Sequence, residues 1–153
     1  MTDMRRKDRA LSEEEAQALL DRTEYGVLST VGGDGRPYGV PLNYCVIGRA
    51  VYFHCAVEGQ KLEHLKNNRA VSFCVVGDTH LIPEKFSTRY ESAIVTGEAE
   101  EVFGSVKQAA LEGLIRKYSP SRFEEGLAYI ARAQSQTRVF RITISRLTGK
   151  ARK

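Results

Sequence analysis

The order of apolar and polar positions along the chain predicts a protein built mainly from strands. Runs rich in β-branched and aromatic residues alternate with short turn sequences, which is typical of consecutive antiparallel strands. The run at 70–76, AVSFCVV, is almost wholly apolar and predicts a buried strand, while Gly97 predicts a bulge or bend in a longer run. The predicted strands are 25–31, 38–46, 50–56, 70–76, 89–103 and 138–147.

Helical patterns accompany these strands. Ser12 begins the first of them, and Glu15 follows three residues later, which is the pattern of an N-terminal capping box. The polar segment 77–88 is interrupted by Pro83 and is expected to form a loop. The predicted helices are 12–22, 59–68, 105–118 and 122–134.

Pro41 lies inside the second strand-like run, where it cannot donate a hydrogen bond to a sheet. The segment around it is therefore expected to be an edge, a bulge or an opening in the sheet. In an opening, a flat ligand could meet backbone groups that the strand pairing leaves unused. The alternative interpretation is that Pro41 only marks an edge strand.

Mostly sequential strands with short turns predict an antiparallel sheet that is large enough to close. The helices are too few and too late in the chain for repeated strand–helix–strand units. We therefore expect one domain over residues 1–153, mainly β (α+β), forming a small β-barrel with peripheral helices. Residues 1–10 are expected to be a flexible basic tail.

Composition is that of an ordinary globular protein, with 42% hydrophobic and 27% charged residues. No apolar run approaches the roughly 20 residues of a membrane span, and the first residues lack the apolar segment of a signal peptide. We therefore expect a cytoplasmic protein with no membrane partner. The net charge of +4 is concentrated near the two ends. Without a basic stripe or a known nucleic-acid fold, we expect no nucleic-acid partner.

The residues that most often bind metals give no metal signature. Cys45, Cys55 and Cys74 are odd in number and lack C-x-x-C spacing, so they are expected to be buried free thiols. The three histidines are not spaced for zinc, and no H-E-x-x-H or EF-hand pattern is present. No metal site is expected.

The stretch 36–65 indicates an anion-binding corner. Two strand-like runs lead into the N-terminus of a helix that carries Lys61, where free backbone N–H groups and the helix dipole favour a phosphate. The alternative for Lys61 is a solvated surface residue. His54, in the second run, is either a donor near a ligand, titrating near neutral pH, or a core residue satisfied by one hydrogen bond.

Four segments in this order resemble a known family: GRPYGVPLNYCV, VYFHCAVEGQKLEHLKNN, RYESAIVTGEAEEV and LTGK. The chain is similar to pyridoxamine 5′-phosphate oxidase-like proteins and, within them, to the 5-nitroimidazole resistance (Nim-type) branch. The resemblance covers residues 11–150. It implies a split antiparallel β-barrel and a homodimer, with FMN held at the dimer interface.

The resemblance also implies roles for particular residues. The flavin phosphate would meet Lys61 and the turn at 58–59, and the flavin ring would lie along the backbone of 41–44. His54 would orient the substrate or donate a proton, and is the implied catalytic residue. Lys150 matches a lysine that follows the last strand. The implied cofactor-binding residues are Pro41, Leu42, Asn43, Tyr44, His54, Glu58, Gly59, Lys61, Tyr90, Ser92 and Lys150.

The implied activity is that of an FMN-dependent oxidoreductase that reduces a small acceptor such as a nitroimidazole or another nitroaromatic compound. Pyridoxine oxidation itself is in doubt, because the family's Ser/Thr-rich corner reads HCAVEGQK here. No Gly-rich dinucleotide fingerprint is present, so an NAD(P)H donor would bind transiently above the flavin. The phosphate corner would also accept FAD. The alternative function is a flavin- or haem-binding module without fast turnover, in which His54 or His64 would be an axial haem ligand.

Overall fold

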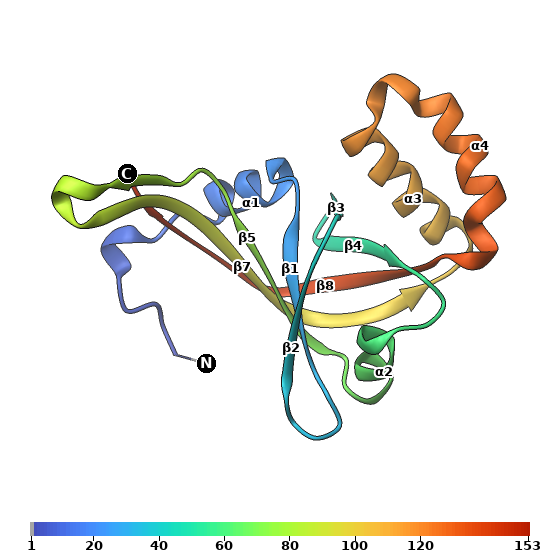
Figure 1. Ribbon diagram of the computed structural model, residues 1–153, viewed down its shortest axis with the longest axis horizontal. Coiled ribbons are helices and arrows are strands. Elements are labelled where there is room, and N and C mark those ends of the chain that lie inside the picture. Colours follow the sequence, from blue (N-terminus) through green and yellow to red (C-terminus); the bar gives the residue numbers. More distant parts are fainter. Residues whose placement is uncertain (1) are drawn as a thin grey trace.

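The computed structural model describes residues 2–153 and contains an eight-stranded antiparallel sheet with four α-helices around it (Figure 1). Met1, the first residue of the predicted tail, lies outside the described residues. The strands are β1 (Gly26–Val31), β2 (Pro37–Leu42), β3 (Cys45–Ile47), β4 (Ala50–Cys55), β5 (Ala70–Val76), β6 (His80–Ile82), β7 (Ser87–Val102) and β8 (Arg138–Arg152). The helices are α1 (Glu13–Arg22), α2 (Gln60–Asn67), α3 (Gly104–Tyr118) and α4 (Phe123–Ala133), with 3₁₀ turns η1 (Lys7–Arg9), η2 (Pro83–Lys85), η3 (Pro120–Arg122) and η4 (Gln134–Gln136).

The sheet is a barrel that is split at one place. Its strands follow the order β2-β1-β5-β7-β8-β4-β3, with β6 paired to β7. The two edge strands, β2 and β3, are consecutive in the chain and are joined by Asn43 and Tyr44. The predicted split antiparallel barrel with peripheral helices is therefore confirmed. Pro41 lies on an edge strand, where its missing N–H group is tolerated.

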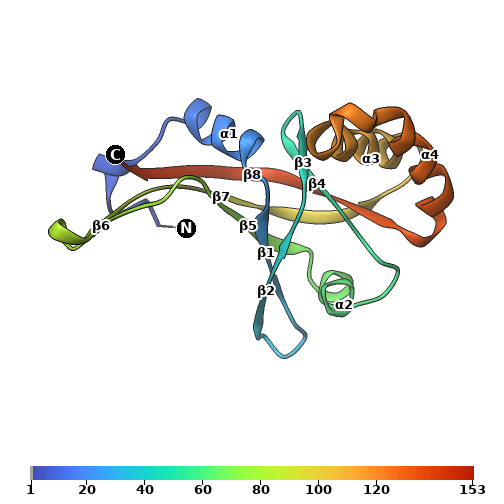
Figure 2. The same ribbon diagram turned by 45° about the horizontal axis from the view of Figure 1, so that its top comes forward.

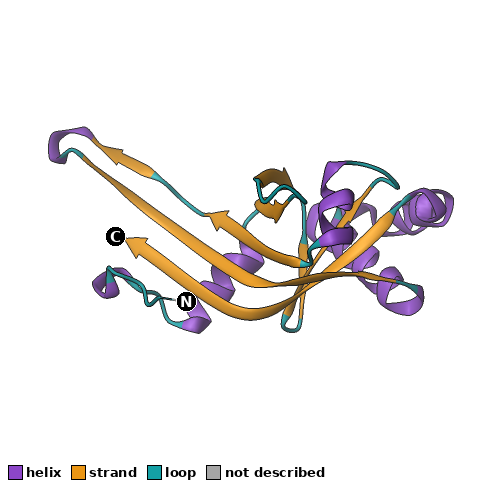
Figure 3. Cartoon of the chain, turned by 90° about the horizontal axis from the view of Figure 1, so that it is seen from below, coloured by secondary structure: helices purple, strands orange, loops and turns teal. Residues whose placement is uncertain are grey.

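Strands β7 and β8 pair along most of their length and extend beyond the barrel as an arm, residues 80–92 and 148–152 (Figure 3). The register shifts between Thr96 and Gly97, which confirms the predicted bulge. A Cβ atom on Gly97 would lie 2.1 Å from the carbonyl oxygen of Thr143, so only glycine allows the two backbones to approach this closely.

Two hydrophobic cores lie on opposite sides of β4. Inside the barrel, Val51 and Phe53 pack with residues of β1, β5, β7, β8, α1 and α2. On the other side, Ala50 and Tyr52 pack against apolar residues of α3 and α4. Figure 2 shows α1 and α2 beside the barrel and the α3–α4 hairpin over β3 and β4. None of the described helices combines the length and apolarity that a membrane span requires.

The first helix is stabilised at its N-terminus as predicted. The Ser12 hydroxyl accepts a hydrogen bond from the Glu15 N–H at 3.1 Å, and the Glu15 carboxylate accepts from the Ser12 N–H at 2.9 Å. Leu19 and Leu20 are buried on the face that covers the barrel core. The capping box therefore fixes where α1 begins, and its apolar face fixes where it lies.

Three predictions from local pattern were wrong. The expected loop at 77–88 contains β6 and η2, because three of its residues pair with the arm of β7. The last strand continues to Arg152, so Lys150 lies inside β8 and not after it. Strand β5 buries only alternate residues, and Val76 is 55% exposed because no helix of the described part of the chain covers the other face of the sheet.

Candidate functional site

His54 reaches its position through the alternation of β4. Ala50 and Tyr52 point from this strand into the core beneath α3 and α4, and His54 is the next residue on the same face. The core ends before His54, which remains accessible to solvent. The strand therefore presents an imidazole at the margin of the helical hairpin.

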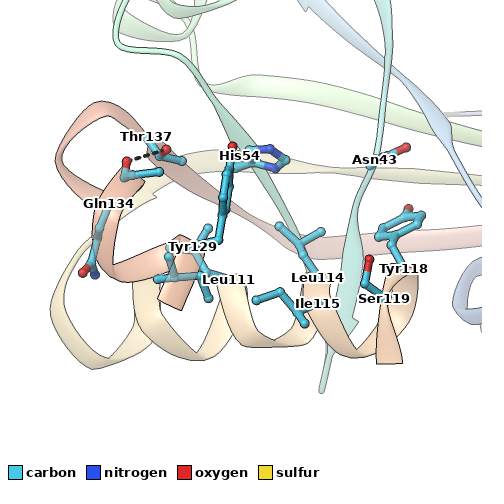
Figure 4. Close-up of a pocket in the computed structure, with 12 residues that line it drawn as sticks. Asn43, His54, Leu111, Leu114, Ile115, Tyr118, Ser119, Tyr129, Gln134 and Thr137 are labelled. Atoms are coloured by element: carbon cyan, nitrogen blue, oxygen red, sulfur yellow. Dashed lines mark hydrogen bonds between the residues drawn. The ribbon is translucent and has the colours of Figure 1, made fainter. Parts of the chain in front are cut away.

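A cavity of about 250 Å³ lies between β4, the β2–β3 linker and the α3–α4 hairpin. Figure 4 shows His54 and Asn43 on the sheet side of this cavity, facing side chains from the helices. The walls are mainly apolar and aromatic, with a few polar groups, as in most small-molecule sites. The lining residues are Asn43, His54, Leu111, Leu114, Ile115, Tyr118, Ser119, Tyr129, Ile130, Ala133, Gln134 and Thr137.

The charge of Lys61 reaches His54 from the start of α2. The pKa of His54 is lowered from its ordinary value, first because the imidazole is partly buried and second because of the positive charge of Lys61. The folded chain therefore favours the neutral imidazole. Since the unfolded chain binds this proton more readily, the stability that His54 contributes is lost as the pH falls below about 6.5.

The N-terminus of α2 has free donors beside this lysine. The carbonyl of Gly59 accepts hydrogen bonds from the N–H groups of Leu62 and Glu63, at 3.2 and 3.3 Å. Within residues 2–153, the N–H groups of Gln60 and Lys61 have no backbone partner, and Lys61 forms no ion pair. Gly59 has a φ of 148°, and nothing lies within 4 Å of where its Cβ would be. This end of the helix is therefore open to an anion.

Tyr44 is a fully buried residue that joins several elements at the split in the barrel. Its hydroxyl donates to the carbonyl of Leu20 in α1, and its ring packs edge-on against Phe73 of β5 at 4.8 Å. The ammonium group of Lys117 in α3 lies 3.6 Å from the centre of the same ring, a cation–π contact. Burial lowers the pKa of Lys117. Tyr44 therefore presents its side chain to the protein core and not to the cavity.

The backbone of Tyr44 is bonded to Tyr118, at the C-terminal end of α3. The Tyr118 hydroxyl accepts a hydrogen bond from the Tyr44 N–H at 3.1 Å. The single proton of this hydroxyl has two carbonyl acceptors within reach, that of Glu24 at 2.5 Å and that of Tyr44 at 3.1 Å. A side chain thus takes the place of the missing strand partner, and in the linker Asn43 alone lines the cavity.

The structure separates the predicted site residues into two groups. Asn43 and His54 line the cavity, Lys61 acts on His54, and Glu58 and Gly59 precede α2. In contrast, Tyr90, Ser92 and Lys150 lie on the arm, where Ser92 pairs with Lys150. His54 pairs with Val139, eleven residues before Lys150 on β8, a separation of about 35 Å along the strand. Within one chain these two groups do not meet.

The residues on the arm share one sheet surface with Pro41. A row formed by Pro41, Val27, Cys74, Ile94 and Thr148 crosses five paired strands on the side away from the barrel core. Val27 and Ile94 are 36% and 45% exposed. We call this surface the outer face.

A second row, adjacent to the first, contains Val76, Ser92 and Lys150. Each residue of this row lies two positions along its strand from a residue of the first row, so both rows point to the same side. Tyr90 lies two residues before Ser92, and its ring centre is 5.9 Å from the Lys150 ammonium. The outer face therefore combines exposed apolar residues with three of the predicted site residues.

Sequence reasoning missed the helical hairpin as a wall of the site. The sequence predicted these two helices from their apolar spacing alone, and Leu111 and Ile130 belong both to the core beneath the helices and to the cavity wall. Tyr118 and Tyr129 have no local signal that distinguishes them from other helix residues. His64, which was considered as a haem ligand, is hydrogen-bonded through Nδ1 to the buried Thr30 at 2.9 Å.

Comparison with known proteins gives the class of this protein. The family model described as pyridoxamine 5′-phosphate oxidase matches residues 12–151, and the chain therefore belongs to that family. This agrees with the resemblance found in the sequence. Comparison with curated protein sequences gives no match.

Several solved structures share the fold at low sequence identity. A protein assigned to 5-nitroimidazole antibiotic resistance in Bacteroides thetaiotaomicron is 22% identical, with a TM-score of 0.78 over 93% of this chain and 86% of that one. The flavocytochrome Anf3 of Azotobacter vinelandii is 22% identical, with a TM-score of 0.85 over 99% of this chain and 72% of that one. A FAD- and haem-binding protein of Mycobacterium smegmatis is 22% identical, with a TM-score of 0.81 over 93% and 72%.

The link between Lys61 and His54 can be tested by titration. In a Lys61→Ala variant, the pKa of His54 should rise toward its ordinary value, because one of the two causes that lower it is removed. Burial remains, so the pKa should stay below that of an exposed histidine. Titration of the imidazole signals by NMR measures the change. A Lys66→Ala variant, which removes the same charge from the other end of α2, should leave the pKa of His54 unchanged. If the pKa of His54 also stays the same in Lys61→Ala, the charge of Lys61 does not act on His54.

The role of the Tyr118 hydroxyl can be tested by its removal. A Tyr118→Phe variant should lose about 2 kcal/mol of unfolding free energy, because the Tyr44 N–H is left without a partner. Denaturant unfolding measures the loss, and amide exchange at Tyr44 should become faster. Tyr129→Phe is the matched control, since Tyr129 lines the same cavity but is 64% exposed. Equal stability of the two variants would contradict this role.

Proposed function

We propose that this protein binds FMN and transfers electrons from a donor such as NAD(P)H to a small acceptor, with nitroaromatic compounds as the acceptor class. The observation that carries the proposal is that Asn43 and His54 line one cavity, while the charge of Lys61 at the start of α2 acts on His54. Family membership supports it, as do the names of similar proteins, which include flavin binding and 5-nitroimidazole resistance.

The residues at the start of α2 fit the phosphate of a flavin. Two unpaired N–H groups, at Gln60 and Lys61, and the positive end of the helix dipole favour an anion there. Lys61 adds a full charge, and within residues 2–153 no carboxylate forms an ion pair with it. The open space beside Gly59 lets a ligand approach the backbone. FAD carries the same phosphate, so this corner would also hold FAD.

The cavity provides the surroundings that the ring and an acceptor need. A bound flavin supplies the electron transfer itself, while the protein supplies binding, orientation and electrostatics. Leu111, Leu114 and Ile130 exclude water from one side. His54, held neutral by partial burial and by Lys61, can orient an acceptor through a hydrogen bond and hold a proton at one ring nitrogen. Asn43 adds an amide donor and acceptor at the cavity wall.

A homodimer would complete this site. The cavity of one chain, about 250 Å³, is below the roughly 300–1,000 Å³ of typical ligand pockets. The outer face exposes Val27, Val76 and Ile94, which no helix within residues 2–153 covers. It also carries the predicted site residues that stay far from His54 in one chain. A second copy seated on this face would bury the apolar row and bring its own Ser92 and Lys150 toward the flavin.

The second candidate is a flavin- or haem-binding module without fast turnover. Two similar structures, named as a flavocytochrome and as a FAD- and haem-binding protein, support this alternative. The neutral and accessible His54 has the chemistry of an axial ligand. His64 is hydrogen-bonded to Thr30 through Nδ1, which leaves its Nε2 for a ligand. Cytoplasmic placement stays a prediction from the sequence.

An absorption spectrum of the purified protein tests the cofactor first. Flavin bands are expected, with FMN in the acid extract.

Lys61→Ala should weaken FMN binding about tenfold, because a hydrogen-bonded charge is lost, whereas Lys66→Ala should not. Under anaerobic conditions NAD(P)H should bleach the bound flavin, and a nitroimidazole should restore the colour. A Soret band, or a flavin that no donor reduces, would favour the binding module; a colourless protein that takes up no FMN would contradict both functions.

The homodimer is tested by a charge on the outer face. Ile94→Glu should convert the dimer to a monomer in light scattering, because the carboxylate would be buried against the apolar row. The same variant should lose bound flavin although Lys61 is intact. Phe103→Glu is the control, since Phe103 is 67% exposed at the start of α3 and away from this face. A wild-type monomer at all concentrations would contradict the dimer.

A further inference from the structure

Arginines without a carboxylate partner are concentrated at one end of the molecule. Most arginines of the chain form ion pairs, including those on β1–β2, α3 and the barrel part of β8. Among residues 2–153, the arginines outside any ion pair are Arg5, Arg9, Arg89, Arg132, Arg146 and Arg152. Arg9 and Arg152 lie together beside the arm, although they are distant in sequence.

Backbone pairing brings these two residues together. The N–H of Leu11 donates to the carbonyl of Gly149 at 2.9 Å, and Ala10 bridges to Lys150. Residues 7–11 therefore lie along the free edge of β8. The Arg9 guanidinium contacts the Tyr90 hydroxyl at 3.4 Å, while Lys150 approaches the ring of the same tyrosine. The hydrogen bond from Arg9 is the largest of the causes that lower the pKa of the Tyr90 phenol, and Lys150 lowers it further.

A groove of about 540 Å³ runs between η1, the start of α1 and the end of β8. Arg9, Arg152 and Lys153 line it, and Lys150 flanks it through Tyr90. We call these four residues the basic groove. Arg9, Lys150 and Arg152 are half-buried residues, and among residues 2–153 none of them forms an ion pair. An anion with several charges could therefore bind more than one of these cations at once.

The carboxylates in the groove limit what fits there. Asp8 is held by Arg6 through two hydrogen bonds, and Glu15 accepts from the Ser12 N–H as part of the helix cap. Both stay negative and border the groove, so a long polyanion lying across it would be repelled. A compact anion with several charges avoids them. Arginine forks bind phosphate oxygens in a bidentate manner, which favours phosphate over a single carboxylate.

We propose that the basic groove binds the diphosphate of a nucleotide cosubstrate. The nature of the nucleotide rests on the proposed function, in which the donor is a nicotinamide dinucleotide. Such a donor contains a diphosphate. The groove lies on the arm, far along β8 from the cavity of its own chain. A donor held here therefore serves the flavin of a second copy, and the binding needs no Gly-rich dinucleotide fingerprint.

The test uses inorganic pyrophosphate as the probe and the full-length protein, with calorimetry at low ionic strength. Arg9→Gln and Arg152→Gln should each weaken pyrophosphate binding about tenfold, since each loses a hydrogen-bonded charge. Arg132→Gln is the matched control: Arg132 also lacks an ion pair and also lies beside a tyrosine ring, at 5.9 Å from the centre of Tyr129. It should bind pyrophosphate like the wild type. Thermal unfolding confirms that each variant is folded.

Three results would overturn the proposal. The first is an absence of saturable pyrophosphate binding, and the second is an equal loss in Arg132→Gln, which would indicate only a general charge effect. The third is binding of a DNA duplex that is tighter than binding of pyrophosphate and is lost in the same two variants, since the groove would then be a nucleic-acid contact. Flavin content is measured separately, so failure of the flavin function leaves the pyrophosphate result intact, and the reverse also holds.

Discussion

The hydrogen bonds between the Tyr118 hydroxyl and the backbone of Tyr44 hold the protein together where its sheet is open. A barrel that is split between β2 and β3 leaves polar backbone groups without a strand partner, and such groups are costly to bury. One side chain from α3 satisfies them, and Lys117, one residue earlier, covers the Tyr44 ring. The opening, the helical hairpin and the cavity between them therefore form one unit. Movement of α3 would change the backbone next to Asn43, and with it the wall of the site.

Strand β4 connects this unit to the chemistry. Its two faces belong to two different cores, so its alternation is fixed on both sides. The direction of His54 cannot change without removing Tyr52 from its core and burying the polar imidazole in the barrel core. The neutral state of the imidazole then follows from its place at the edge of a core and from the nearby lysine. Position and protonation state thus have the same origin in the packing of one strand.

The sequence predicted correctly those features that depend only on residues close together along the chain. The capping box at Ser12 and Glu15, the bulge at Gly97 and the edge position of Pro41 are of this kind. The bond from Tyr118 to Tyr44 joins residues 74 positions apart, and no local pattern encodes such a contact. The arm was misjudged for a similar reason, because β6 has only three residues and becomes a strand through its pairing with β7. The candidate site was therefore predicted on its sheet side and missed on its helical side.

The edges of the open sheet also determine how copies of this protein can associate. Strand β2 contains Pro37 and Pro41, which offer no N–H group to a further strand, and β3 has only three residues and packs against α3 through Cys45. Exposed strand edges are the usual starting points of uncontrolled sheet growth, and both are blocked here. A barrel that never closes can thus keep its opening for a ligand without recruiting strands from other molecules.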